Sequence, residues 1–283
     1  MSFIDKLMGI ATGAGLGGRG RIDMSQTPLT EEASSSSTAG QHGIVEFFEL
    51  TLKDREKKRA RTIGGKKRPI LQDVTFKLPT GAYALLGDPI DRMAFIDLII
   101  GRRHAAAGKM NIYTRMSYPI GRIVHFSPPV IGGDYVRFLS QLYNFVENDA
   151  LATMRDVLPW PNVLAHRLDD TRNHERLALS LGVATFIDVD TYIIDGNIID
   201  PFFPVEFVRF VAERFAARTA DRNILISTRQ YQVACSVAVD SLIIENGQLM
   251  IEEGVDAGKV KATHLAVASA PAEERDDDDD GII

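Results

Sequence analysis

The segment "ALLGDPIDRMAFIDLIIG", Ala84 to Gly101, is typical of a buried strand followed by an amphipathic helix. Gly87 and Pro89 mark the turn between them. A strand, a tight turn and a helix form the usual frame for holding a phosphate at a helix N-terminus. This turn has one glycine, and it has no lysine, serine or threonine where a phosphate would need them. The sequence therefore predicts the frame of a phosphate site without its ligand-binding groups.

Strands and helices alternate on both sides of this stretch. Strands are expected at residues 44–52 and 69–78 before it, and an extended segment at residues 109–119 after it. The later elements are expected to be a helix capped by Asp134, a helix at 169–187, a strand at 191–195, a helix from Pro204, a strand at 223–228 and a hairpin turning at Asn246-Gly247. The fold class is therefore α/β, with a mainly parallel sheet, helices on both faces and a small antiparallel layer.

Composition limits the function classes. The chain has 283 residues, 45% of them apolar and 25% charged, which is a globular composition. No run of 18 apolar residues predicts a membrane-spanning helix. The single cysteine, Cys235, suits a reducing compartment, and the formal charge of −6 gives no reason to expect a nucleic acid partner.

The two ends differ from the middle. Residues 1–43 contain glycine- and serine-rich runs, and residues 263–283 end in "DDDDDGII", so both are expected to be disordered around a folded domain of residues 44–262. Gly13 to Gly18 match the dinucleotide pattern GxGxxG, but they follow no strand and open no helix, so a linker is expected. The basic segment from Lys53 to Arg68 is either a solvated loop or a contact for acidic lipids or an acidic partner.

The order of these elements resembles the ATPase domain of ABC transporters, with its antiparallel β subdomain and helical insert on a P-loop NTPase core. The resemblance covers residues 44–250 and is nearest to the ATPases that export capsular polysaccharide and O-antigen chains. Three segments carry it: "SYPIGRIVHFSPPVIGGDYVRFLSQLY" from Ser117 to Tyr143, "TYIIDG" from Thr191 to Gly196, and "AVDSLIIENGQLM" from Ala238 to Met250.

The family's phosphate loop, GxxGxGK[ST], is largely absent at the matching positions. Gly87 matches the first glycine, while Ile90 and Arg92 stand at the second and third. Met93 replaces the lysine and Ala94 replaces the serine or threonine. The lysine reaches the β- and γ-phosphates and the hydroxyl holds Mg²⁺, so neither role can be filled here. Arg92 retains the ability to attract an anion.

The family's other catalytic positions have changed in the same way. The Q-loop glutamine falls at Ser127, the catalytic glutamate at Gly196 and the switch histidine at Arg229. Asp195 matches the Walker B aspartate, and it is either a structural acid or a remaining metal ligand; we favour the structural role. Lost transition-state donors cost about 2.7–4 kcal/mol each, so this set predicts no catalytic residues, no metal and no cofactor, with ATP and Mg²⁺ bound only if the site is unorthodox.

Three functions remain open. The first is a catalytically degenerate ABC ATPase-like subunit of a polysaccharide exporter, which pairs with itself or with an active ATPase and attaches to a membrane permease. The second is a soluble scaffold or regulator that kept the fold. The third is an unorthodox ATPase. The favoured first function places the protein in the cytoplasm, peripheral on the inner face of the cell membrane.

A loop between the expected Q-loop and the insert helix contains apolar residues. Phe126, Val130 and Ile131 are expected either to pack against the core or to be exposed and bind the membrane partner. Exposed apolar residues in a loop favour an interface, and aromatic anchors dominate binding energies. We therefore predict that these three residues contact the permease.

The composition of the ends leads to a first test. Deletion of residues 1–43 or 263–283 should leave the melting temperature of the domain unchanged, because these segments contain little apolar surface to bury. Limited proteolysis should stop near Ile44 and near Lys261. A marked fall in melting temperature on removal of either segment would contradict the domain boundaries.

Overall fold

The computed structural model describes residues 43–53, 62–63, 66–67, 69–122, 129–196, 198–219 and 221–259. The glycine-rich run from Gly13 to Gly18 and the acidic C-terminal run lie outside the described residues, as does most of the basic segment from Lys53 to Arg68. Only the short strands β2 (Thr62–Ile63) and β3 (Lys66–Lys67) of that segment are described, and they pair antiparallel.

An antiparallel sheet of three strands forms one side of the domain. Its order is β4 (Leu71–Leu78), β1 (Val45–Leu52) and β6 (Ala107–Ile112). Phe47 of β1 lies opposite Phe76 on one side and Met110 on the other. The predicted antiparallel layer is confirmed, and the segment expected to be merely extended supplies its third strand.

The main sheet has the order β10-β9-β5-β8-β7. Its strands are β5 (Ala82–Gly87), β7 (Thr191–Asp195), β8 (Asn223–Ser227), β9 (Asp240–Glu245) and β10 (Gln248–Glu252). Strands β7, β8, β5 and β9 are parallel to one another, and β10 is antiparallel to β9. Asn246 and Gly247 both have positive φ, as their two-residue hairpin turn requires. The predicted α/β architecture, mainly parallel with an antiparallel subdomain, is confirmed.

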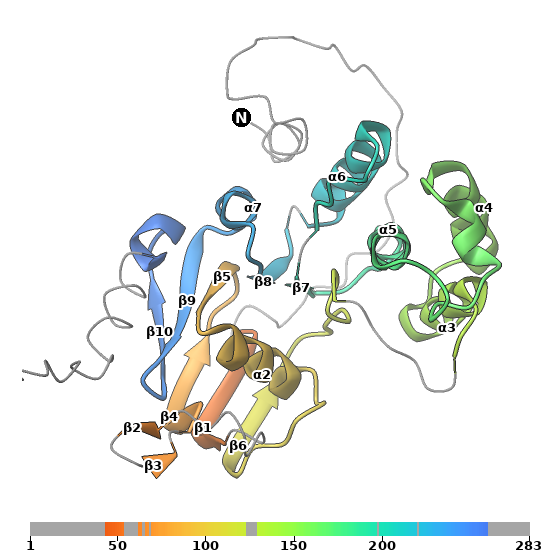
Figure 1. The fold of residues 1–283 in the computed structure, drawn as a ribbon. Helices are drawn as coiled ribbons and strands as arrows, with labels where there is room; N and C mark the ends of the chain where they lie inside the picture. Colours follow the sequence, from red (N-terminus) through yellow and green to blue (C-terminus); the bar gives the residue numbers. More distant parts are fainter. Residues whose placement is uncertain are drawn as a thin grey trace, which may run out of the picture.

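The helices flank this sheet and form an insert at one end of it. They are α2 (Pro89–Ile99), α3 (Gly132–Tyr143), α4 (Glu147–Val157), the 3-10 helix η2 (Pro161–Leu164), α5 (Asn173–Ala184), α6 (Val205–Thr219) and α7 (Tyr231–Val237). Helix α3 begins before Asp134, with Ile131 at its N-cap and no side-chain cap bond, so the prediction that Asp134 caps it is wrong. Figure 1 shows α3 and α4 together at one side, beyond α5 and away from the antiparallel sheet.

Two apolar cores lie on opposite faces of the main sheet. Because side chains alternate along a strand, Ile193 of β7 faces one core and Ile194 faces the other. The first core joins α2 to the antiparallel sheet, and Figure 1 shows α2 between the two sheets. The second core contains residues of α3, α4, α5 and α6. Helix α2, which contains Ile90 to Ala94, is thus held in place by apolar packing.

The helical insert is fixed to the main domain by buried tyrosines. The Tyr118 hydroxyl donates a hydrogen bond to the Ser180 carbonyl of α5 at 2.6 Å. The Tyr118 ring also contacts the rings of Tyr135 and Tyr143 on α3, with centroids 6.4 and 6.2 Å apart. Burial raises the pKa of Tyr135 to about 12, so these hydroxyls stay protonated at neutral pH. This cluster sets where α3 and the loop before it lie.

The packing of α2 can be tested at Phe95. Its ring is fully buried and lies 5.8 Å from the ring of Phe47, centroid to centroid. Phe95→Ala should lower the free energy of unfolding by about 3–5 kcal/mol, because it leaves a cavity between α2 and β1. Met93→Ala, on the exposed side of the same helix, should change it by less than about 0.5 kcal/mol. Equal effects of the two changes in urea denaturation would contradict the described packing.

Candidate functional site

The carboxyl ends of β5, β7 and β8 meet around one open pocket of about 500 Å³. Its lining comes from the start of α2, from the segment before the undescribed loop, and from the residues that end β7 and β8. The lining residues are Pro89, Ile90, Arg92, Met93, Gly121, Arg122, Asp195, Gly196, Ser227, Thr228 and Arg229. Ligands bind at such strand ends in open α/β sheets, so this pocket is the candidate site.

Most of the site residues predicted from the sequence meet here, and some do not. Ile90, Arg92, Met93, Asp195, Gly196 and Arg229 line the pocket. Ala94 is buried in the core below α2, and Gly87 is not part of the lining. Ser127 and Phe126 lie outside the described residues.

The turn between β5 and α2 is too short to wrap around a phosphate. Strand β5 ends at Gly87 and α2 begins at Pro89, so Asp88 alone joins them. The Asp88 carboxylate caps the helix, accepting a hydrogen bond from the Ile90 N–H at 2.9 Å. The Asp88 carboxylate thus already accepts the hydrogen bond of an amide at the helix N-terminus, where a phosphate would otherwise bind.

Asp195 is paired with an arginine that the sequence analysis did not identify. Arg122 Nε donates to Asp195 Oδ2 at 2.5 Å, and Arg122 Nη1 donates to Asp97 Oδ1 of α2, also at 2.5 Å. Burial disfavours the charge on Arg122, but the attraction of Asp195 and Asp97 outweighs it and raises the pKa of Arg122. Arg122 therefore places a permanent positive charge between the end of β7 and α2.

The backbone beside β7 brings Arg122 to this position. Residues Met116 and Ile120 form parallel bridges with Thr191 and Ile194. The Asp195 N–H donates to the Ile120 carbonyl at 2.7 Å, which leaves Arg122 two residues further on beside the Asp195 side chain. The only signal in the sequence was an arginine shortly after the segment 109–119 that was expected to be extended, and nothing in the sequence identified Asp97 as the second partner.

Gly196 has no space for a side chain. Its φ is +119°, a conformation that favours glycine, and an added Cβ would lie 2.8 Å from the Gly121 carbonyl oxygen. Since the Gly121 carbonyl belongs to the backbone, it cannot move aside cheaply. Gly196, which the resemblance matches to the catalytic glutamate of the ABC family, is therefore closed to any larger residue in this backbone.

Two further arginines share the pocket. Arg92 Nη1 donates to Ser227 Oγ at 3.1 Å and to the Thr228 carbonyl at 3.4 Å. Burial lowers the pKa of Arg92, Arg229 lowers it further, and Asp195 and Asp88 oppose these effects. Arg229 follows β8 and is exposed.

Gln230, next to Arg229, fixes the segment that follows β7. Its Oε1 accepts hydrogen bonds from the backbone N–H groups of Ile198 and Ile199, both at 3.3 Å, and its Nε2 donates to the Ile199 carbonyl at 2.7 Å. The sequence analysis did not identify this glutamine. It links the ends of β7 and β8 below the pocket.

The predicted partner-binding loop is partly described. Val130 is half-buried and packs against the core, which is one of the two arrangements expected for it, and its carbonyl accepts the Leu168 N–H. Ile131 is exposed at the start of α3. Three more exposed apolar side chains, Phe138, Leu142 and Val146, continue along and just beyond α3. Among the described residues of this region, α3 and its two ends therefore present exposed apolar surface.

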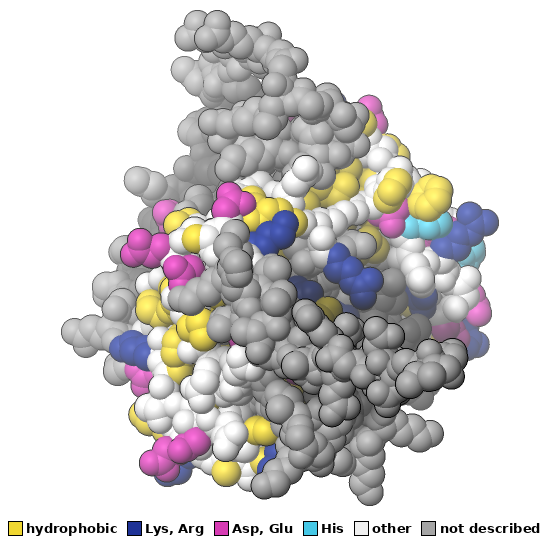
Figure 2. Space-filling view, turned by 60° about the vertical axis from the view of Figure 1, so that its left-hand side comes forward, with side chains coloured by type: hydrophobic (Ala, Val, Ile, Leu, Met, Phe, Trp, Pro, Cys, Tyr) yellow, Lys and Arg dark blue, Asp and Glu magenta, His cyan; other side chains and the backbone are white. Residues whose placement is uncertain are grey.

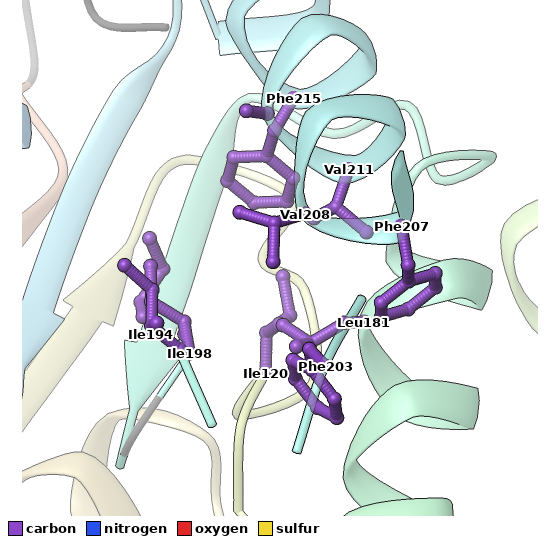
Figure 3. A pocket seen from close by; sticks show the side chains of 11 residues that line it. Ile120, Leu181, Ile194, Ile198, Phe203, Phe207, Val208, Val211 and Phe215 are labelled. Atoms are coloured by element: carbon purple, nitrogen blue, oxygen red, sulfur yellow. The ribbon is translucent and has the colours of Figure 1, made fainter. Parts of the chain in front are cut away.

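A second, apolar cavity of about 30 Å³ lies between β7, α5 and α6 (Figure 3). Figure 3 shows Ile194 and Ile198 on one side and Phe203, Phe207 and Phe215 around the other. All eleven lining residues are apolar. Since no polar side chain reaches this cavity, it has no group for chemistry, and the arginine-lined pocket remains the candidate site.

No protein-family model and no curated protein matches the sequence. Solved structures do match the fold. One is an ATP-binding subunit of an ABC transporter, with a TM-score of 0.55, 19% identity, and coverage of 80% of this chain and 99% of that one. Another is a metal-chelate type ABC transporter in an inward-facing conformation, with a TM-score of 0.52, 14% identity, and coverage of 79% and 89%. This chain has the ABC ATPase fold.

The resemblance drawn from the order of strands and helices is confirmed at the level of the fold. No helix among the described residues is long and apolar enough to cross a bilayer. Figure 2 shows basic, acidic and apolar side chains mixed over the described part of one face.

The role of Arg122 in holding β7 to α2 can be tested by mutation. Arg122→Met should lower the free energy of unfolding by about 3 kcal/mol, because it leaves Asp195 and Asp97 mostly buried without their cation. The two carboxylate side chains are only 13% and 24% exposed. Arg115→Met, at an arginine that is 71% exposed, should change it by less than about 0.5 kcal/mol. Chemical denaturation that finds the two variants equally stable would rule out a structural role for the Arg122 ion pairs.

Proposed function

We propose that this protein is a catalytically degenerate subunit with the ABC ATPase fold, which has kept the fold for binding partners and lost ATP hydrolysis. The observation that carries this proposal is the ion pair between Arg122 and Asp195. In the family, the matching aspartate helps to hold Mg²⁺. Here a guanidinium lies against that carboxylate, and it carries the positive charge that a metal ion would otherwise supply.

The surroundings of Asp195 support the same function. Asp88 already accepts the hydrogen bond of a helix N-terminal amide, and Gly196 has no space for a glutamate. Met93 cannot donate a hydrogen bond, and Ala94 points into the core. Restoring hydrolysis would require changes in backbone geometry as well as in side chains, which distinguishes this chain from an ATPase with one missing group.

The partner we propose is the permease of an ABC exporter, with the protein held at the cytoplasmic face of the cell membrane. Support comes from the fold and from the exposed apolar residues at the start of and along α3. The polysaccharide or O-antigen type of exporter is proposed from the resemblance of residues 117–143, 191–196 and 238–250 alone. A dimer with a second copy or with an active ATPase follows from the same resemblance.

Catalysis is tested by an ATPase assay on the purified full chain. We expect phosphate release with Mg²⁺ and ATP to equal that of a heat-treated control. Met93→Lys should add no activity, and Gly196→Glu should destabilise the protein without adding activity, because its Cβ meets the Gly121 carbonyl. Steady turnover that disappears in Asp195→Asn would refute the proposed function.

Partner binding is tested by membrane association in cells. Because Val130 packs against the core, the change is best made at exposed positions: Ile131→Asp together with Leu142→Asp should move the protein from the membrane to the soluble fraction. Val239→Asp is the matched control, since Val239 is exposed but lies just before β9, away from α3. If the double variant folds normally and stays on the membrane, the docking surface is elsewhere. The basic segment Lys53 to Arg68 is then the next candidate.

A further inference from the structure

The arginine-lined pocket has the size of a ligand site although it lacks the family's phosphate-binding groups. Its volume of about 500 Å³ lies within the range of small-molecule pockets, roughly 300–1,000 Å³. Three guanidinium groups line it, from Arg92, Arg122 and Arg229, and Asp195 is the carboxylate among the lining residues. These guanidinium groups differ in whether a carboxylate of the chain already pairs with them.

Arg122 is not free. It bridges Asp195 and Asp97, so both of those carboxylates and the guanidinium between them are already in contact. The carboxylate of Asp88, close to Arg92, likewise holds the Ile90 amide. The acidic groups around the pocket therefore each have a bonding partner of their own.

Arg92 and Arg229 differ from Arg122 in this respect. Arg92 donates only to neutral oxygens, and its Nε is buried with no hydrogen-bond acceptor among the described residues. The Arg229 side chain forms no hydrogen bond or ion pair with any part of the chain that the structure describes, while its backbone carbonyl accepts a hydrogen bond from the Tyr231 N–H. The positive charge of each guanidinium disfavours the other, as the lowering of the Arg92 pKa by Arg229 records. A bound anion would relieve this repulsion and supply the missing acceptor.

We propose that this pocket binds a phosphate-type oxyanion without a divalent metal, held between the guanidinium groups of Arg92 and Arg229. Guanidinium groups match the geometry of phosphate oxygens, whereas the amides of a phosphate loop are absent here. The anion would link α2 to the end of β8, because Arg92 lies on the former and Arg229 follows the latter. The inference extends the proposed function, since it assigns the altered site a metal-free ligand in place of Mg²⁺ and ATP.

Calorimetric titration of the full chain with pyrophosphate, in EDTA at low ionic strength, tests the proposal. We expect saturable binding that is weakened at least tenfold by Arg229→Gln and by Arg92→Gln, and weakened by added salt. Arg209→Gln, at an exposed arginine of α6, is the matched control and should bind as the original chain does. Because Arg92 bonds to Ser227 and Thr228, its variant is checked by circular dichroism, while Arg229→Gln tests the site at an exposed position.

A second titration, with ATP in EDTA, separates two sources of the phosphate group. Equal affinity for ATP and pyrophosphate would identify the phosphates alone as the recognised chemistry, and tighter binding of ATP would add the nucleoside. Absence of binding to either, binding only with Mg²⁺, or equal binding by all three variants would overturn the proposal. Loss of this inference leaves the proposed function intact, since that is decided by turnover; turnover with Mg²⁺ would refute the proposed function whatever the result in EDTA.

Discussion

The rest of the site depends on the contact of Arg122 with the carboxylates of Asp195 and Asp97. It joins the end of β7 to α2, and it places a fixed cation at the carboxylate that ends β7. Because all three side chains are largely buried, each charge depends on the others for its compensation. Side chains of the protein itself thus compensate these charges in the pocket.

Three contacts within the chain hold the frame of this pocket. In this chain, α2 is held by an apolar core shared with the antiparallel sheet, its N-terminus is capped by Asp88, and the strand end opposite is neutralised by Arg122. None of these contacts needs a ligand. The fold and the chemistry are separable, since packing specifies the first and a few polar groups specify the second.

The sequence predicted the layers of the fold because its strands are short and strongly apolar and its turns carry clear signals, as at Asn246-Gly247. It did not predict α4 or α7, which bury few residues: Ala150 and Met154 in α4, and Val233 and Ala234 in α7. In the site, the matched positions from Ile90 to Met93 and at Asp195, Gly196 and Arg229 do converge. Arg122, Asp97 and Gln230 were missed because their partners are distant in sequence, and only the pairing of residues 116–120 with β7 brings Arg122 to Asp195. The sequence left both packing and exposure open for Val130, because a loop position gives no signal of burial.

The most direct test of this account is a crystal structure of the full chain grown with Mg²⁺ and a non-hydrolysable ATP analogue. The account predicts that Arg122 remains on Asp195 and Asp97, and that no metal ion is bound to the Asp195 carboxylate. A Mg²⁺ ion coordinated by Asp195, with Arg122 turned away and the analogue's phosphates at the N-terminus of α2, would contradict it.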